Sequence, residues 1–159
     1  PGRHAPRAPR RAAPQPQPLV TSFDDVLAAI AAPLPEAAGP WTTAQHLDHC
    51  AASIAASIDG YPALKPLVIR VTIGAIVKRR FLRAGAMRHD TCAPLPGGAP
   101  PPLRDRGDAL ASLTAAIERL RGHAGPLAPH PVYGRCSAAD YERLHAIHVA
   151  DHLRAIRGA

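Results

Sequence analysis

The stretch LHAIHVADHL, residues 144–153, contains three histidines within eight positions: His145, His148 and His152. Their spacing of three and four residues matches the 3.6-residue turn of an α-helix, so all three side chains project from one face. The glutamate and the arginines of the same region fall elsewhere around the helix. The spacing therefore predicts a helix from Ser137 to about Arg157, whose histidine face points into the protein.

A histidine pair at positions i and i+4, such as His148 and His152, is geometrically a chelate. Two imidazole nitrogens on adjacent turns can reach one ion at about 2.0–2.1 Å. A third ligand is needed from elsewhere in the fold, and His49 in WTTAQHLDHC can point towards the interior from a second helix. Three imidazoles leave positions open for water or substrate, which is typical of catalytic rather than structural metal sites.

Two alternatives to this ligand set stay open at the level of spacing. A histidine that faces inward is more often a hydrogen-bonded core residue than a ligand, and the chain has nine histidines. His46 and His145 are also candidates, so the spacing does not choose which three would bind. Burying several imidazoles without partners is costly, which favours an ion that satisfies them together.

Apolar residues at helical spacing predict four further helices. These helices extend from Thr21 or Ser22 to Pro33, from Thr42 or Thr43 to Gly60, from Pro66 to Arg83, and from Asp105 to Gly122. The buried face of the third is expected to be formed by Leu67, Val71, Gly74, Ile76, Val77 and Phe81. No segment alternates with a period of two, so we predict an all-α bundle of four main helices with a short extra N-terminal helix.

Two segments lack helical periodicity. The first 18 residues are rich in Pro, Arg and Ala and are predicted to be a disordered tail, which leaves residues 19–159 as the helical domain. Residues 85–107 form a long connection in which Pro and Gly are frequent, so no helix or central strand is expected there. Connections of this length are usually either mobile or functional.

The net charge of +7 comes almost entirely from arginines spread along the chain, with Lys65 and Lys78 as the only lysines. Only one dense basic patch occurs in the predicted domain, KRRFLR, residues 78–83. Because the other arginines are scattered, we expect no specific nucleic-acid partner. The longest apolar run, residues 64–77, is interrupted by charged residues, which predicts no membrane span. The three cysteines form no CxxC pair and are odd in number, which favours a reducing, cytoplasmic location.

The segments WTTAQHLDH and HAIHVADHL together resemble the DinB-like superfamily of metal-binding four-helix bundles. Members of that group carry a Trp eight residues before a His on the second helix and an H-x3-H on the last helix. These positions are Trp41, His49, His148 and His152 here. Further segments look like one uncharacterised branch of the group, and the resemblance covers about residues 23–153. They are SFDDVLAAI, HCAASIAASIDGYP, GAMRHDTCAPLPGG and HPVYGRCSAADYERLHAIHVADHL.

The resemblance implies that His49, His148 and His152 bind a divalent ion, usually zinc or nickel, with water completing the coordination. It also implies a homodimer. Related proteins include thiol S-transferases and a mycothiol-dependent isomerase, in which the metal activates a low-molecular-weight thiol. We therefore expect a metal-dependent thiol S-transferase or hydrolase that acts on a small molecule. The alternative is a non-catalytic metal-binding or structural bundle.

Several polar residues are candidates for proton transfer or for support of the ligands. His145, Asp151 and His130 are the candidate catalytic residues, and His46 and Ser53 are further candidate neighbours of the site. Asp151 stands where many members of the superfamily carry a second histidine, so it is expected either to orient a ligand or to face water. His130 lies in a loop next to proline, where an ordinary loop histidine is the alternative.

Overall fold

The structure is a computed structural model that describes residues 20–158. Along the chain it contains α1 (Phe23–Ala31), α2 (Thr43–Asp59), α3 (Leu67–Val71), α4 (Ile73–Ala84), α5 (Arg106–Arg121) and α6 (Ala138–Ile156). Within the described residues the only β pairing is an isolated bridge between His130 and Gly134. The prediction of an all-α fold is thereby confirmed. The predicted tail, residues 1–18, lies outside the described residues.

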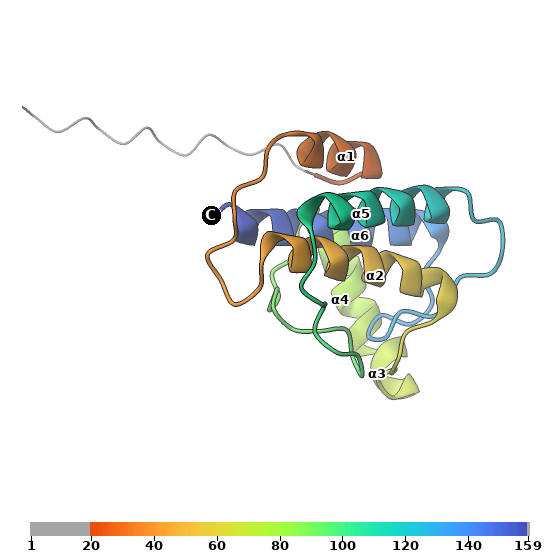
Figure 1. The fold of residues 1–159 in the computed structure, drawn as a ribbon. Helices are drawn as coiled ribbons and strands as arrows, with labels where there is room; N and C mark the ends of the chain where they lie inside the picture. The colour runs from red at the N-terminus through yellow and green to blue at the C-terminus, as the bar shows by residue number, and fades with distance from the viewer. Residues whose placement is uncertain (1–19, 159) are drawn as a thin grey trace, which may run out of the picture.

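Helix α2 packs against both α5 and α6, while α1 lies along one side of this group and α3 and α4 along the other (Figure 1). The core is formed by the apolar faces of α1, α2, α5 and α6. Its largest members include Phe23, Val26, Leu47, Ile54, Leu113, Ile117, Val149 and Leu153. Burial of each such side chain contributes roughly 1.5–3 kcal/mol. This packing turns the histidine-bearing faces of α2 and α6 towards each other.

Polar caps determine where the helices begin. The hydroxyl of Ser137 accepts a hydrogen bond from the backbone N–H of Asp140 at 3.0 Å, and the carboxylate of Asp140 accepts one from the N–H of Ser137 at 3.3 Å. The same reciprocal arrangement begins α1 and α2. Helix α2 ends at Gly60, whose φ of 96° suits glycine. These caps fix the start of the two helices that carry the histidines.

The predicted third helix, from Pro66 to Arg83, is two helices in the structure. They meet at Thr72, whose backbone is not helical (φ −108°, ψ −93°) and whose hydroxyl donates to the carbonyl of Val68 at 2.6 Å. Thr72 and its two neighbours, Val71 and Ile73, are all β-branched, which weakens a helix at this point. The prediction of one continuous helix is therefore wrong.

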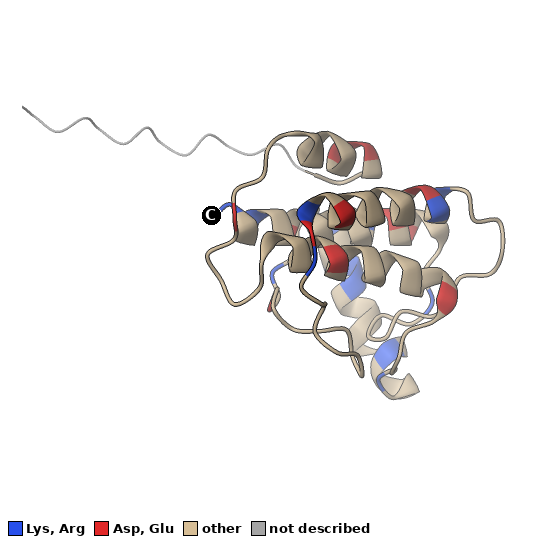
Figure 2. Cartoon of the chain, viewed as in Figure 1, with Lys and Arg blue, Asp and Glu red and all other residues tan. Residues whose placement is uncertain are grey.

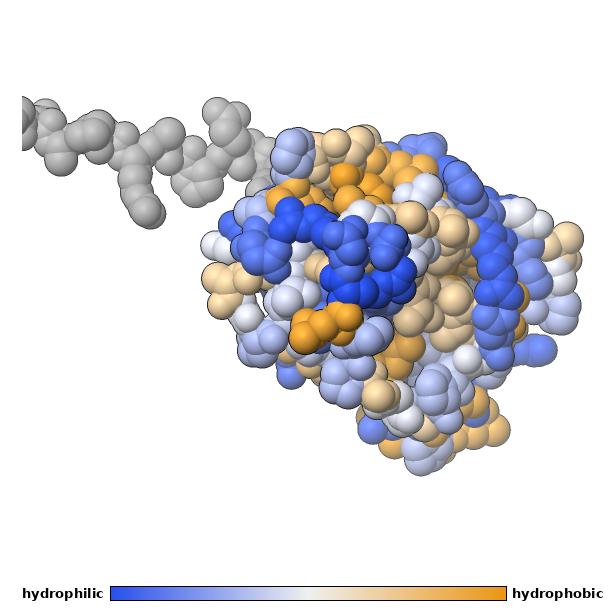
Figure 3. All heavy atoms as spheres, in the orientation of Figure 1, coloured by the Kyte–Doolittle hydropathy of each residue, from blue (hydrophilic) through white to orange (hydrophobic). Residues whose placement is uncertain are grey.

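The buried face expected for this segment is also largely wrong. Leu67, Val71 and Ile76 are 64%, 59% and 64% exposed, and only Gly74 of the predicted set is buried. The apolar contacts of α4 with a small cluster centred on α6 come from Phe81 and its neighbour Leu82. The segment consequently has an exposed apolar patch, visible in Figure 3 at the lower edge where Figure 1 places α3. The patch comprises Leu64, Leu67, Val68, Val71, Ile73 and Ile76.

Charged side chains are distributed over several helices rather than gathered on one of them. Lysines and arginines occur on α3, α4, α5 and α6, and acidic residues are interspersed on α1, α2 and α5 (Figure 2). Ion pairs link distant elements, for example Arg119 on α5 with Asp59 at the end of α2 at 2.6 Å. No helix of the described residues has the length and apolar character needed to cross a bilayer.

Gly74 allows α4 to lie directly against the loop that carries His130 and Tyr133. A Cβ atom at Gly74 would lie 1.9 Å from the carbonyl oxygen of Val132, which belongs to that loop. Backbone atoms cannot rotate out of the way as a side chain can, so a larger residue would displace the loop. The loop itself is closed by hydrogen bonds of 2.8 and 3.2 Å between the backbones of His130 and Gly134.

The Gly74→Ala variant tests this contact. Alanine favours a helix interior by about 1 kcal/mol over glycine, yet we expect the variant to be destabilised by at least about 1 kcal/mol because the methyl group would clash with Val132. Gly122→Ala is the matched control, since a Cβ there has no contact closer than 3.5 Å. Chemical denaturation of both variants measures the difference, and equal or greater stability of Gly74→Ala would contradict the packing described.

Candidate metal centre

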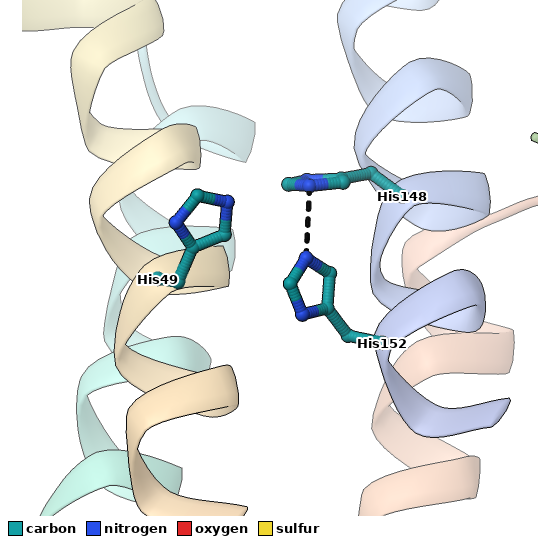
Figure 4. A group of neighbouring side chains, drawn as sticks. All are labelled: His49, His148 and His152. Atoms are coloured by element: carbon teal, nitrogen blue, oxygen red, sulfur yellow. Dashed lines mark hydrogen bonds between the residues drawn. The ribbon is translucent and has the colours of Figure 1, made fainter. Parts of the chain in front are cut away.

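Three histidine side chains converge between α2 and α6 (Figure 4). His49 comes from α2, and His148 and His152 come from successive turns of α6. One nitrogen atom of each ring lies within 4.8 Å of the others. The structure thus brings together the three residues that the sequence singled out as metal ligands. Their convergence follows from the i, i+4 spacing on α6 and from the packing of α2 against it.

The nitrogen positions fit a single divalent ion. The Nε2 atoms of His148 and His152 lie 3.1 Å apart. Two nitrogens at this separation can both lie about 2.0–2.1 Å from one ion, with an angle of about 100° between the two bonds. His49 approaches from the opposite helix, with ring centroids 5.3 Å from His148 and 4.9 Å from His152. A small inward movement of the three rings would complete three-nitrogen coordination.

All three rings are in the state that a metal ligand requires. Burial, reinforced by repulsion from neighbouring imidazoles, lowers the pKa of His49 to about 4 and holds the pKa values of His148 and His152 well below their usual range. The rings are therefore neutral near pH 7, so each has a nitrogen lone pair to offer. No proton has to be removed before an ion binds.

His46 fixes the orientation of His152. Their Nδ1 atoms lie 2.9 Å apart, and both residues are almost completely buried. If Nε2 of His152 gives its lone pair to an ion, its proton must reside on Nδ1, and His46 Nδ1 accepts the resulting hydrogen bond. His46, which the sequence left as a possible ligand, therefore lies behind the cluster and holds one of its members.

Asp151 and His89 form a pair beside the candidate ligands. The buried carboxylate of Asp151 accepts hydrogen bonds from the backbone N–H of His89 at 3.1 Å and from its ring Nδ1 at 2.8 Å, and it also pairs with Arg154. The ring of His89 lies 4.8 Å from that of His148 and 5.2 Å from that of His152, measured between centroids. A carboxylate can only accept, so Nδ1 of His89 carries a proton, and in the neutral ring Nε2 has the lone pair.

The alternative that Asp151 faces water is wrong, because its side chain is only 1% exposed. Burial by itself raises the pKa of this carboxyl group, but the hydrogen bonds from His89 and Arg154 outweigh that effect and lower it. Asp151 is therefore a carboxylate at neutral pH, close to where the positive charge of an ion would be. His89 had no assigned role in the sequence, since it lies in the non-helical connection between α4 and α5 and no periodicity marks it.

A cavity of about 190 Å³ opens beside the cluster. His49, His148 and His89 line it, and so do the candidates His130, His145 and Ser53. The connection after α4 contributes one wall through Met87, Leu95 and the adjacent prolines. None of the three remaining candidates joins the metal-ligand cluster itself. They are therefore placed to contact a molecule in the cavity rather than the ion.

The burial of so many neutral imidazoles predicts a steep dependence of stability on pH. The folded chain holds the pKa of His49 at about 4 and of His130 and His145 at about 3, whereas unfolded histidine titrates near 6.5. Below pH 6.5 the unfolded chain binds more protons, so the stabilisation is complete above that pH and is lost as the pH falls through these lower values.

The metal-free protein should therefore lose unfolding free energy between pH 7 and pH 5, by about 1.4 kcal/mol per pH unit for each such histidine. Urea denaturation at several pH values measures the slope. The His145→Phe variant keeps a ring at that position but no titrating group. Its unfolding free energy should therefore change less steeply with pH, by the contribution of one histidine. A stability that does not change over this pH range would contradict the burial of neutral rings.

Comparison with known proteins places this site in a family but not in a known activity. No curated protein and no solved structure matches the chain at the significance that we required. A family model described as a protein of unknown function, DUF1569, matches residues 20–158, which include all six helices and every residue of the candidate centre. The chain belongs to the DUF1569 family of proteins of unknown function.

Proposed function

We propose that the protein is a DinB-like, divalent-metal-dependent enzyme in which His49, His148 and His152 hold a zinc or nickel ion. The observation that carries this proposal is the convergence of three neutral imidazole nitrogens within 4.8 Å, next to a cavity. A structural ion is usually closed off by four protein ligands, whereas three ligands beside a cavity leave room for a reacting molecule. The resemblance to DinB-like four-helix bundles supports the same ligand set.

An ion held there would lower the pKa of a coordinated thiol or water towards neutrality. The chain supplies the acceptor for the released proton. His89 lines the cavity beside His148, and in its neutral form Nε2 has the lone pair because Nδ1 donates to Asp151. We therefore assign proton transfer to His89 and the orientation of its ring to Asp151. In this assignment His145 is not the proton acceptor.

Two separate spaces that share His49 favour a transferase over a hydrolase. His49 lines the cavity of about 190 Å³ and also a wider surface hollow of about 610 Å³ between α2, α5 and the proline-rich connection. Asp48, Arg104 and Arg119 are among the residues that line that hollow. A transferase must bring two molecules to one reactive centre, so the cavity, which His89 lines, can take the low-molecular-weight thiol and the hollow the second small-molecule substrate. A hydrolase would need only one of these spaces.

We also propose that the protein is a homodimer, as the resemblance implies. The exposed apolar patch of α3 and α4 supports association, because soluble monomers rarely expose large apolar patches. We also propose a cytoplasmic location, which is supported by the three cysteines, all free in the structure. The alternative function is a non-catalytic metal-binding bundle.

Metal content is the first test. The purified protein should contain about one zinc or nickel ion per chain, and His148→Ala should lose most of it because a two-nitrogen site binds far more weakly. His123→Ala, on the loop after α5 and outside the cluster, is the matched control and should keep its ion. Elemental analysis after dialysis measures all three proteins. Full metal content in His148→Ala would contradict the proposed site.

His89 separates the catalytic proposal from its non-catalytic alternative. His89→Ala should retain the metal, because the ring is not in the ligand cluster, but its turnover in a thiol-transfer assay should fall by about 10²- to 10⁴-fold. Asp151→Asn should show a smaller loss, since it only misorients the ring. If the wild-type protein binds metal and thiols but transfers no thiol to any electrophile of a broad panel, the result would favour the non-catalytic alternative.

A further inference from the structure

One end of the cavity is lined by Tyr61, His130, Tyr133 and His145, which we call the neutral pole. The four residues are joined by ring contacts. His130 stacks on Tyr133 with centroids 4.1 Å apart and lies 5.4 Å from Tyr61, while His145 stacks on the buried Tyr141 at 5.4 Å, which in turn lies 6.3 Å from His130. The hydrogen bonds around these rings determine which atoms face the cavity as donors and which as acceptors.

The proton positions on His145 follow from a chain of three contacts. The Tyr61 hydroxyl lies 3.2 Å from the carbonyl oxygen of Ser53 and 3.1 Å from Ser57 Oγ, which lies 2.7 Å from His145 Nε2. A carbonyl has no proton, so Tyr61 donates to Ser53 and Ser57 donates to Tyr61. Only one arrangement then places a proton in every contact, and in it His145 donates from Nε2. The Nδ1 atom of His145 therefore keeps a lone pair.

This lone pair is open to the cavity. No described residue forms a hydrogen bond with Nδ1 of His145, although the residue is only 3% exposed. Among the described residues the only completely enclosed side-chain polar atom without a partner is Asp48 Oδ2, so Nδ1 must be reached from the cavity that His145 lines. The chain of donors ends at the Ser53 carbonyl, which cannot pass a proton onward. Because burial also lowers the pKa of His145 to about 3, this lone pair accepts a hydrogen bond that positions a ligand and does not take up a proton.

His130 offers the cavity a hydrogen-bond donor, whereas His145 offers an acceptor. Its Nδ1 atom accepts hydrogen bonds from the backbone N–H groups of Val132 at 3.1 Å and Tyr133 at 3.2 Å. Because both partners are donors, Nδ1 has no proton, and the proton of the neutral ring resides on Nε2. Nε2 has no partner among the described residues and is not enclosed, so this N–H is available to the cavity. The loop packed on Gly74 therefore supplies a fixed donor.

The neutral pole carries no formal charge at neutral pH. Burial lowers the pKa of His130 and His145 to about 3 and raises the pKa of Tyr61 and Tyr133 to about 12. No lysine or arginine lines the cavity. Lys78, whose charge helps to lower the pKa of His130, is paired with Asp140 at 2.9 Å. The single carboxylate of the lining, Asp90, belongs to an exposed residue and accepts a hydrogen bond from the N–H of Cys92.

We propose that the neutral pole binds an uncharged polar group of the substrate, such as a carboxamide, whose carbonyl accepts from His130 and whose N–H donates to His145. The proposal rests on the proposed function for the metal end of the cavity and names the class of molecule that would enter it. A carboxylate would lose its hydration without gaining a cation, and it would set its lone pairs against that of His145. An alkyl chain would leave both fixed polar atoms without a partner.

Three thiols of nearly equal size test this specificity. In 3-mercaptopropionamide, 3-mercaptopropionate and 1-butanethiol the sulfur atom can coordinate zinc, and only the far end of the molecule differs. Calorimetric titration of the zinc-loaded protein should show the amide binding at least about tenfold more tightly than either analogue, since each analogue leaves a buried polar group unpaired. Binding of the carboxylate or the alkanethiol as tightly as the amide would overturn the proposal.

Two variants localise the effect. His130→Phe removes the donor, and Ser57→Ala removes the hydroxyl that fixes the proton on Nε2 of His145. Each variant should reduce the preference for the amide to about threefold or less. Thr114→Ala, which removes a hydroxyl that donates within α5, is the control and should keep the full preference. Preservation of the full preference in both variants would also overturn the proposal. The same three thiols titrated into His148→Ala without added zinc separate this inference from the metal site, because the substitution leaves the four residues of the neutral pole unchanged. In this variant the amide should still bind more tightly than the other two thiols, although with lower affinity than in the wild type. Loss of this order of affinities would contradict the proposed specificity of the neutral pole.

Discussion

The structure of the site depends on the packing of α2 against α6, which buries several imidazole rings in their neutral form. Burial of polar rings without partners costs free energy, and most of these rings find one: His46 pairs with His152, and His145 pairs with Ser57. The nitrogens of His49, His148 and His152 instead converge on a common point. An ion at that point would satisfy them together, so the proposed metal and the stability of the fold depend on the same contact between helices.

Hydrogen bonds of the surrounding shell set the proton positions that give the site its chemistry. Asp151 commits one nitrogen of His89 and leaves the other for proton transfer in the proposed mechanism. Backbone N–H groups that donate to Nδ1 of His130 leave its Nε2–H as a donor to the cavity. The Ser57 hydroxyl group, which accepts from Nε2 of His145, leaves its Nδ1 as an acceptor. Three histidines with the same side chain thus obtain three different roles. Each role follows from a neighbour that is itself fixed by a helix or by a closed loop.

Periodic features could be predicted from the sequence, and irregular ones could not. The i, i+4 pair of His148 and His152 follows from helix geometry alone. Spacing left His46 and His145 open as alternatives to His49, and only the resemblance to the DinB-like group singled out His49. The exposed face of α3 and α4 was missed because apolar spacing indicates a helix but not whether another element covers it. His89 was missed for a different reason: its position depends on how the connection after α4 folds back onto α6, which no repeat in the sequence encodes.

The most direct test of the central claim is X-ray absorption at the metal edge of the purified protein. The account predicts a first shell of nitrogen and oxygen atoms at about 2.0–2.1 Å, with the outer-shell scattering of three imidazole rings. That pattern should reduce to two rings in His49→Ala if the variant retains metal. A shell dominated by sulfur, or one without imidazole scattering, would contradict a centre formed by His49, His148 and His152.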